Sequence, residues 1–547
     1  MRNVCVTVSL SLGVALVVAS IVVLNGVGRA ASTDSGAPER VVASPATLSE
    51  TFTYLPLVLR NYDSKVYPNC RFGVTGSLEQ FSVFDITAQL NAGWYMDFWA
   101  HAPFDGAPAA EFFPLIFVTQ DRGGSTVCGP DYGYHINGGL DSGLASLVAA
   151  NPGLTWIIGN EPERLGQGDI CPQQYAEAYH DAYYFIKQND PTAQVAFAGL
   201  VQVTPARLQY LDIVWSTYLE RYGETMPVDV WTMHAYVLSE SDDGDANIPL
   251  GTDPALSIPF GFNCVDPNSF CHAEHSDIDL FVDQIVMMRE WMKAHGQQDR
   301  PLLLTEFSLL KPYHYYGTCT VNVCPPEGVE GCFCDENRET FNPTRVANFM
   351  EDAFDYLMTA ADPRLGYPRD DYRLVQRWMW YSLETYPPAA GHASNLMTAD
   401  AGYVLTLQGR RWQSYVRDIP AQIDLAILDV PTAVAQTSAM SEPVTVTLAV
   451  EVLNTGNTLL NRTARVVFYS DAALTQPVAA ATFSGLGGCA SASTIVTATW
   501  PGLTVGTHPF WARIESAGNE TDTSDNVGSG IAFVALARLY LPVVLSN

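Results

Sequence analysis

Two short segments place a glutamate where an apolar, strand-like run ends. In WIIGNEPE (residues 156–163) the run is followed by Asn160 and Glu161, and LLLTEFSLL (302–310) contains Glu306. Hydrolysis of a glycosidic bond needs such a pair of carboxyl groups, because one protonates the departing oxygen while the other attacks or stabilises the anomeric carbon. The pair therefore suggests Glu161 as an acid/base, with Asn160 beside it to bind a sugar hydroxyl.

A lone glutamate at a strand end is usually solvated, so this interpretation depends on the elements that hold both residues. Between residues 70 and 384, eight apolar segments of strand length alternate with amphipathic stretches such as 175–188 and 277–296. The eight segments are 70–76, 93–100, 112–120, 154–161, 194–201, 228–237, 301–310 and 375–384. This alternation predicts the α/β class and a (β/α)8 TIM barrel. Catalytic groups of a barrel lie at the carboxyl ends of its strands, so strands four and seven would bring the two glutamates to one mouth.

Over roughly residues 66–418 these motifs resemble the retaining glycoside hydrolases of clan A. The resemblance implies Glu161 as acid/base and Glu306 as nucleophile. It also implies substrate-site roles for His234 and Tyr236 of WTMHAYV, which match the clan's His-x-Tyr, and for Trp380 of RWMWYS, which matches the tryptophan that floors the sugar subsite.

Two further residues are weaker candidates near the mouth. Trp99 comes late enough in the second predicted strand to face the mouth. Many clan members carry an arginine after strand two, but segment 93–100 has none, which leaves Arg71 on the first strand as a stand-in.

Retention requires the two glutamates to hold different ionisation states at one pH. We expect Glu306 to be ionised with the help of Tyr236, and Glu161 to be protonated because burial against the substrate and the nearby negative charge raise its pKa. Retaining carboxyl groups stand about 5 to 5.5 Å apart and inverting ones roughly 6.5 to 9.5 Å apart. The sequence does not determine this distance.

Other chemically capable side chains are interpreted as structural. Trp94 and Trp378 are expected in the core, Glu163 in a loop and His180 in helix packing. The segment SDDGDAN (241–247) lacks the bidentate glutamate of an EF-hand loop, and His272 and His275 have no third ligand in view. No metal and no cofactor is therefore expected.

The amino end reads as a secretory signal over residues 1–31, with an uncleaved membrane anchor as the alternative. Removing Cys5 with the signal leaves ten cysteines, an even number that suits disulfides in an oxidising compartment. Cys264 and Cys271 can close one short loop. A zinc site is the alternative for a second loop, but its spacing is unusual for zinc; that loop holds Cys319, Cys324, Cys332 and Cys334.

The net charge of −30, from 58 acidic and 28 basic residues, argues against nucleic acid and anionic membranes as partners. A neutral polysaccharide or oligosaccharide substrate is compatible with it. We expect a secreted or cell-surface protein that is a monomer, with cell-surface attachment as a possibility.

The remaining chain suggests a linker and a second domain. Residues 32–65 form the linker, which contains YLPLVLRN (54–61); a near copy, YLPVVLSN, lies in the C-terminal segment 536–547. Both copies are either edge strands or attachment signals. Residues 421–535 alternate in strand fashion, predict an antiparallel β-sandwich and resemble the bacterial cell-adhesion-related immunoglobulin-like domain. We expect this domain to be a spacer or an attachment module.

Two functions remain open. The first is a secreted retaining glycoside hydrolase that cleaves β-glycosidic bonds in a polysaccharide. The second is a catalytically inactive surface protein that binds carbohydrate or mediates adhesion. Release of reducing sugar from a panel of β-glucans, xylans and mannans discriminates between them.

Overall fold

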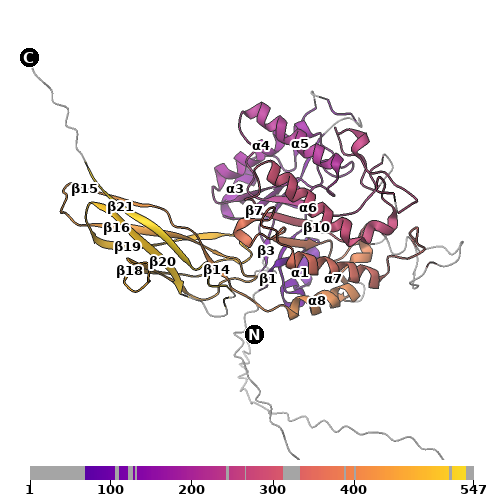
Figure 1. Cartoon of the computed structure of the whole chain (residues 1–547). Helices are drawn as coiled ribbons and strands as arrows, with labels where there is room; N and C mark the ends of the chain where they lie inside the picture. The colour runs from indigo at the N-terminus through magenta and orange to yellow at the C-terminus, as the bar shows by residue number, and fades with distance from the viewer. Residues whose placement is uncertain are drawn as a thin grey trace, which may run out of the picture. The chain divides into compact units, whose positions relative to one another are not determined.

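The computed structural model describes residues 68–104, 110–120, 127–129, 132–241, 245–264, 266–311, 324, 333–386, 390–399, 402–515, 520 and 522–537 (Figure 1). All of them fall within one compact unit, residues 63–547. The predicted signal, the linker and both YLP segments lie outside the described residues, as does part of the acidic loop 241–247.

Each of the eight predicted strand segments contains a strand. These strands are β1 (Asn69–Thr75), β2 (Ala92–Met96), β3 (Glu111–Phe112), β4 (Leu115–Ile116), β7 (Thr155–Ile158), β8 (Gln194–Phe197), β9 (Trp231–His234), β10 (Leu302–Phe307) and β11 (Arg377–Trp380). The prediction of one strand over 112–120 is wrong, because Pro114 separates β3 from β4 and cannot donate to a ladder. Its last residues form β5 (Val118–Gln120), which pairs antiparallel with β6 (Tyr134–Ile136).

The nine strands form two parallel sheets. One has the order β3-β2-β1-β11-β10-β9 and the other the order β4-β7-β8. A single parallel bridge from Ala196 to Val230 joins the ends of the two sheets beside β8 and β9. The first and the eighth predicted strands, more than 300 residues apart in sequence, are direct neighbours in the larger sheet.

Helices lie outside the strands, and the predicted helical stretches 175–188 and 277–296 fall on α4 and α6 (Figure 1). The α-helices are α1 (Leu78–Val83), α2 (Ile86–Leu90), α3 (Ser142–Ala150), α4 (Pro172–Asn189), α5 (Pro205–Tyr222), α6 (Ile278–Ala294), α7 (Pro343–Thr359) and α8 (Leu407–Asp418). Shorter elements are η1 (Pro254–Leu256), η2 (His272–Ser276), η3 (Pro368–Asp370), η4 (His392–Ser394), β12 (Met397–Thr398) and β13 (Val404–Leu405). Within the described residues, no helix is long and apolar enough to cross a membrane.

Local signals explain where the long helices begin and end. The Thr204 hydroxyl accepts a hydrogen bond from the Arg207 amide at the start of α5, where Pro205 occupies the first helical position. The same helix stops at Gly223, whose φ of +72° is readily adopted only by glycine. Asp277 caps α6 in the same way as Thr204 caps α5.

Alternate residues along the strands build two different cores. The larger core joins the strands to the helices and includes Trp156, Trp378 and Trp380. A smaller core consists almost wholly of residues on or beside the strands, namely Trp94, Met96, Phe113, Leu115, Ile157, Ala196, Val230, Leu303 and Met379. Trp94 and Trp378 are thus core residues, as predicted. Because side chains alternate between faces of a strand, the two cores lie on opposite faces of the sheets.

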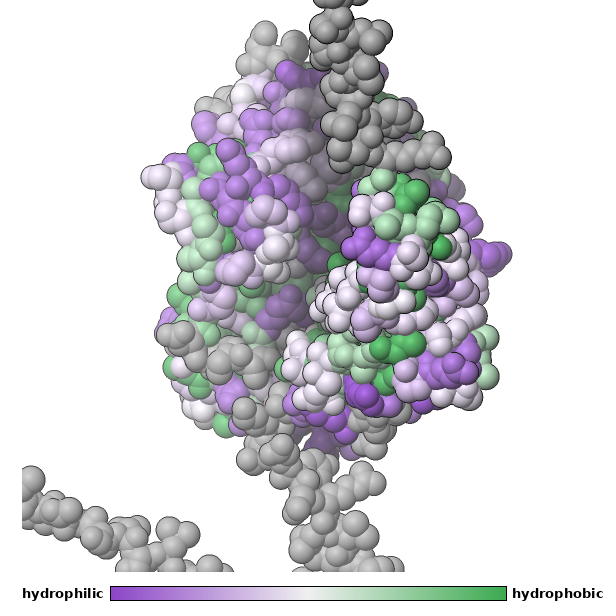
Figure 2. Space-filling model, turned by 90° about the vertical axis from the view of Figure 1, so that its left-hand side faces the viewer, coloured by the Kyte–Doolittle hydropathy of each residue, from purple (hydrophilic) through white to green (hydrophobic). Residues whose placement is uncertain are grey.

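The carboxyl-terminal part is rich in strands, and the four strands predicted there are present as β16, β17, β19 and β20. Its strands are β14 (Leu425–Asp429), β15 (Ala433–Thr437), β16 (Val444–Asn454), β17 (Ala464–Tyr469), β18 (Pro477–Phe483), β19 (Ser493–Leu503), β20 (Gly506–Glu515) and β21 (Val527–Leu536). They form the sheets β14-β16-β19 and β15-β21-β20-β17-β18, and both sheets contribute to one hydrophobic core. The prediction of a wholly antiparallel arrangement is wrong, because β15 pairs parallel with β21. Figure 2 shows hydrophobic residues in small separate groups among hydrophilic ones on one face of the molecule.

Four disulfides occur among the described cysteines. They are Cys70–Cys489, Cys128–Cys171, Cys264–Cys271 and Cys324–Cys334. The predicted Cys264–Cys271 bridge is confirmed, and the bridge from Cys324 to Cys334 favours disulfides over zinc in the second loop. Cys319 and Cys332 lie outside the described residues.

Candidate active site

Glu161 and Glu306 line the same cavity, as the strand positions predict. The cavity has a volume of about 350 Å³. Both side chains are nearly inaccessible, with 2% of Glu161 and 5% of Glu306 exposed. The other lining residues are Phe98, Phe117, Asn160, Arg164, Gln167, Tyr236, Leu310, Tyr381 and Ala390.

An irregularity in β10 directs Glu306 into this cavity. Leu302, Leu304 and Phe307 all belong to the larger core, so strict alternation would point residue 306 toward the helices. The pairing register between β10 and β9 shifts between Leu304 and Glu306, which sets Glu306 opposite His234. A bulge of this kind re-aims a side chain, and it does so here for a carboxyl group.

His234 lies between the two carboxyl groups. Its Nδ1 atom is 3.1 Å from Glu161 Oε1 and 3.7 Å from Glu306 Oε2. Tyr236, two residues further, donates its hydroxyl hydrogen bond to Glu306 Oε2 at 2.9 Å. Both predicted partners of the pair are therefore in place, and both are buried. Gly199 gives them room, because a Cβ atom there would lie 2.4 Å from the His234 ring.

Glu161 is held by the loop that follows β7. Its φ of +40° is uncommon for a residue other than glycine, and its amide donates to the Gly199 carbonyl at 3.0 Å. Arg164 Nη1 donates to Glu161 Oε2 at 2.8 Å. Asn160 lines the same cavity and donates to Gln167 Oε1 at 3.4 Å. The motif therefore delivers an amide and a carboxyl group side by side, as predicted.

The pKa values of the two glutamates shift in opposite directions in the structure. Burial raises the pKa of Glu306 to about 7, although the neighbouring His234 opposes this shift. Burial also acts to raise the pKa of Glu161, but the hydrogen bond from His234 and the charge of Arg164 outweigh it and lower that pKa below its usual value. The raised pKa expected for Glu161 rests on burial against the substrate and stays a prediction, whereas the Arg164 ion pair that lowers this pKa was missed by the sequence interpretation.

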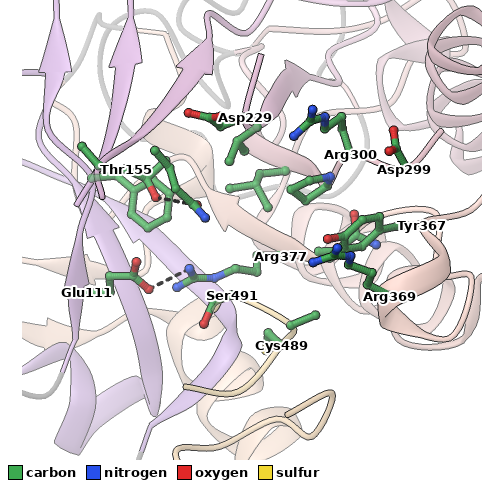
Figure 3. Close-up of a pocket in the computed structure, with 18 of the residues that line it drawn as sticks. Glu111, Thr155, Asp229, Asp299, Arg300, Tyr367, Arg369, Arg377, Cys489 and Ser491 are labelled. Carbon is green, nitrogen blue, oxygen red and sulfur yellow. Dashed lines mark hydrogen bonds and ion pairs between the residues drawn. The ribbon is translucent and has the colours of Figure 1, made fainter. Parts of the chain in front are cut away.

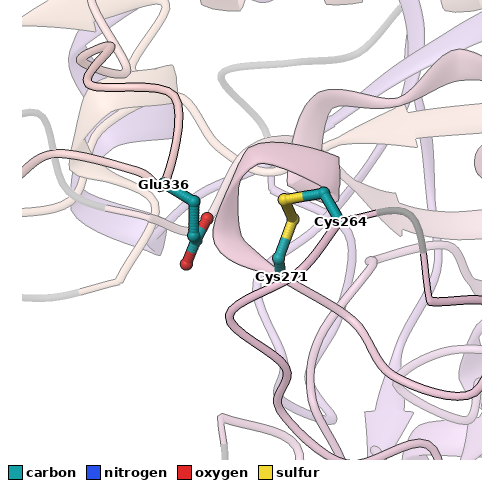
Figure 4. Close-up of side chains that lie close together, drawn as sticks. All are labelled: Cys264, Cys271 and Glu336. Carbon is teal, nitrogen blue, oxygen red and sulfur yellow. A yellow bond between two sulfur atoms is a disulfide. The ribbon is translucent and has the colours of Figure 1, made fainter.

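Two groups of side chains bring together atoms that ligate metals in other proteins. Donor atoms of Glu161, His234 and Glu306 lie within 4.8 Å of one another, and they are engaged in the hydrogen bonds described above. The second group is Cys264, Cys271 and Glu336 (Figure 4). Its two sulfur atoms are bonded to each other, so no thiolate remains to bind a metal ion. We identify neither group as a metal site.

Two predicted aromatic residues do not line the cavity. Trp380 is fully buried in the larger core, where its indole N–H donates to the Ser394 carbonyl at 2.8 Å. Trp99 is 60% exposed. Their sequence neighbours Tyr381 and Phe98 line the cavity instead.

Arg71 is not a stand-in for an arginine at the mouth. Its guanidinium is buried and makes a bidentate ion pair with Asp370, with distances of 2.7 and 2.8 Å. It also donates to the Thr455 carbonyl in the strand-rich part. The guanidinium group in the cavity belongs to Arg164, which the sequence interpretation missed because its position depends on a loop conformation.

Glu163 has a structural role that the sequence interpretation also missed. It is fully buried, accepts a hydrogen bond from the Val201 amide at 2.9 Å and pairs with Arg207 at 3.0 Å. Arg207 pairs with a second buried carboxylate, Glu240, so the loop after β7 is anchored to α5.

The predicted structural histidines are in packing positions. His180 accepts or donates a hydrogen bond with the Tyr218 hydroxyl at 2.8 Å and stacks on Tyr222. His275 is buried and bridges the Val237 carbonyl and the Leu310 amide. Burial lowers the pKa of His275 to about 3, which keeps it neutral.

A second cavity of about 460 Å³ lies at the opposite ends of the strands (Figure 3). Thr155, Gln194 and Arg377, which begin β7, β8 and β11, are among its lining residues. Arg377 forms an ion pair with Glu111 at 2.7 Å, and Lys187 pairs with Asp229 at the same distance. In each pair the opposite charges neutralise each other. The cavity is remote from Glu161 and Glu306, because it lies at the amino-terminal ends of the strands and the glutamates lie at the carboxyl-terminal ends.

No family model and no curated protein matches the chain. Similar solved structures include a GH128 subgroup II endo-β-1,3-glucanase from Sorangium cellulosum, at 16% identity, 63% of this chain, 98% of that chain and a TM-score of 0.36. A GH128 subgroup I endo-β-1,3-glucanase from Amycolatopsis mediterranei, in complex with laminaritriose, is 15% identical and has a TM-score of 0.35. The match covers 63% of this chain and 98% of that chain. A curdlan-specific GH128 subgroup III exo-β-1,3-glucanase from Blastomyces gilchristii, in complex with glucose, is 14% identical and has a TM-score of 0.36. The match covers 63% of this chain and 97% of that chain. A likeness at these values carries no argument about the function of this chain.

Proposed function

We propose that this protein is a secreted glycoside hydrolase that cleaves β-glycosidic bonds of a polysaccharide with retention of configuration. The observation that carries the proposal is the buried pair Glu161 and Glu306 in one cavity, with His234 between them. The nearest oxygens of the pair lie within 4.8 Å, which is closer than the roughly 6.5 to 9.5 Å of an inverting pair. Inverting pairs stand further apart because a water molecule lies between the base and the sugar, so the short separation here supports a covalent intermediate.

The two glutamates divide the work of the proposed reaction, and Glu161 acts first as an acid and then as a base. Glu306 attacks the anomeric carbon while Glu161 gives its proton to the glycosidic oxygen, so the bond to the leaving sugar breaks and a glycosyl ester forms. In the second step ionised Glu161 removes a proton from water, which attacks the anomeric carbon and releases Glu306. Tyr236 orients Glu306 through its hydrogen bond, and Asn160 binds a hydroxyl of the sugar.

We also propose that the strands close into a (β/α)8 barrel over residues 66–418. Phe113 and Pro114 alone separate β3 from β4, and they bond to different neighbours: the Phe113 amide donates to Tyr95, and the Pro114 carbonyl accepts from Ile157. The bridge from Ala196 to Val230 connects β8 to β9. The smaller core around Met379 is what the interior of such a barrel would contain.

For the strand-rich part, residues 421–535, we propose an immunoglobulin-like spacer or attachment domain. Two sheets that share one core support a sandwich. Four disulfides suit the exported protein that the amino-terminal sequence predicts.

The test is release of reducing sugar from β-glucans, xylans and mannans. The wild type is expected to hydrolyse at least one of them, and Glu306→Ala to hydrolyse none. Glu351→Ala is the matched control, because Glu351 pairs with Arg411 at the surface of α7 and leaves the cavity intact. Binding of a glycan without any release of sugar by the wild type would instead favour an inactive carbohydrate-binding protein.

A further inference from the structure

Both oxygens of Glu161 have a hydrogen-bonding partner in the structure. Oε1 faces His234 Nδ1 at 3.1 Å, and Oε2 accepts from Arg164 Nη1 at 2.8 Å. An acid catalyst must present a protonated oxygen to the glycosidic oxygen, and a proton on Oε2 would remove the charge that holds the guanidinium there. Departure of one of the two partners therefore favours the protonated Glu161 that acts as an acid.

Only one of these partners is able to leave. His234 is 1% exposed, fixed in β9 and shared with Glu306. Arg164 is 20% exposed, lies on the loop after β7 and lines the cavity. Its second nitrogen, Nη2, donates to the Asp245 backbone carbonyl at 2.6 Å, so it has a partner on the rim apart from Glu161.

We propose that Arg164 is a displaceable positioning residue, which pairs with Glu161 in the structure and gives way when a glycan enters the cavity. This inference rests on the proposed function. The incoming sugar competes with Arg164 for the space beside Glu161, and Glu161 then takes up the proton that it delivers to the leaving group. Arg164 thus favours the ionised form of Glu161, and its displacement favours the protonated form.

Among the charged groups around Glu161, Arg164 is the one whose movement changes the pKa of Glu161 at every working pH. The titratable and charged groups that face Glu161 are His234 of β9, Tyr236 just after β9, Glu306 of β10, Tyr381 after β11, and Glu163 and Arg164 of its own loop. Among them Arg164 alone is positive at every working pH. Its charge lowers the pKa values of both Glu161 and Glu306.

Arg164→Met and Arg164→Lys test the proposal on an oligosaccharide whose poor leaving group makes the first step limiting. The pH profile of kcat/KM reports the free enzyme, and that of kcat the complex. In Arg164→Met, both limbs of the kcat/KM profile should move to higher pH by about one unit, because an opposite charge at this distance shifts a pKa by about 1 to 3 units. The kcat profile should stay where it is in the wild type, because Arg164 has already left Glu161 in the complex. Arg164→Lys should move neither profile.

Two outcomes overturn the proposal. Unmoved kcat/KM limbs in Arg164→Met would mean that Arg164 supports only the loop, and equal movement of the kcat limbs would mean that it stays on Glu161 in the complex. Arg411→Met is the matched control, since it breaks an ion pair of a partly exposed arginine away from the cavity and should move no limb.

A measurement without turnover separates this proposal from the proposed function. In unliganded protein labelled with carboxyl-¹³C glutamate, the Glu161 signal, assigned by its loss in Glu161→Gln, should titrate at higher pH in Arg164→Met than in the wild type. If the wild type hydrolyses no glycan, the proposed function fails while this titration still decides whether Arg164 controls Glu161. An unchanged titration overturns the role of Arg164 even in an active enzyme.

Discussion

Glu161 and Glu306 differ because their partners differ. Glu161 is hydrogen-bonded to Arg164, which is positively charged, and to His234, whose imidazole becomes positive on protonation. Glu306 accepts a hydrogen bond from the neutral hydroxyl group of Tyr236. A neutral donor offsets burial less than a charged one. Two carboxyl groups in one cavity are thus held at different pKa values, in the order opposite to the one that the proposed acid Glu161 and nucleophile Glu306 need.

Replacement of Glu161 should separate the two steps of the reaction. In Glu161→Ala, oligosaccharides should lose roughly 10² to 10⁴-fold in rate, while aryl glycosides with acidic leaving groups should still form the glycosyl-enzyme. Added azide should then release a glycosyl azide of retained configuration, because it needs no general base. Product analysis by NMR checks this, with Glu351→Ala as the control. An azide product of inverted configuration would contradict the assignment of Glu306.

The pH dependence follows from the pair titrating together. The productive form carries one proton, so kcat/KM should fall when that proton is lost and also when a second one is gained. Because the pKa of Glu306 is raised to about 7 and that of Glu161 is lowered, the alkaline limb should lie near pH 7 and the acid limb well below it. A profile of kcat/KM against pH checks this. An optimum above pH 8 would show that the pair is not the titrating unit.

At the scale of the element, side-chain alternation explains both what the sequence predicts and where it fails. Trp94 and Met96 face the smaller core, and Phe98, two residues further, continues on that face toward the cavity. Trp99 points away from it. In the same way Met379 leads to Tyr381, and Trp380 faces the helices. Counting alternate residues from Trp94 would have indicated Phe98 from the sequence alone.

Other features are not readable from sequence pattern. The eight strand segments and the glutamate pair were predictable because apolar runs and their ends are local signals. The bulge that turns Glu306 inward is visible only in the pairing of β10 with β9, and the partners of Arg164 depend on a loop. Contacts of this kind join residues that no periodicity relates.

The anchor of the Glu161 loop is the buried group of Glu163, Arg207 and Glu240. Arg207→Met should leave two buried carboxylates without their cation, which costs about 3 to 5 kcal/mol of the free energy of unfolding. Arg221→Met on the same helix is the matched control, because its exposed pair with Glu177 is worth at most about 1 kcal/mol. Denaturant unfolding of both variants checks this. Equal stabilities would show that the buried group is not an anchor.

At the scale of the whole molecule, contacts tie β1 to the strand-rich part. Cys70 forms a disulfide with Cys489, and its amide donates to the Asn457 carbonyl at 3.0 Å. The next residue, Arg71, donates to the Thr455 carbonyl. These links involve the amino-terminal end of the strands, away from the glutamates. The strand-rich part is therefore expected to affect stability more than catalysis.

The Cys70–Cys489 disulfide provides the test of this view. It joins residues 419 apart, so its loss in Cys70→Ser/Cys489→Ser should remove a large restriction on the unfolded chain and cost about 2 to 5 kcal/mol. If the two proposed domains fold independently, calorimetry should resolve two transitions in this variant where the wild type shows one.

The matched control is Cys264→Ser/Cys271→Ser, whose disulfide spans only 7 residues and should therefore cost less in the same model. Neither variant should change kcat at a temperature where both are folded, because neither disulfide touches the glutamate cavity. A single transition in Cys70→Ser/Cys489→Ser, shifted but not split, would show that the contacts of Arg71 and Asn457 suffice to couple the two parts into one cooperative unit.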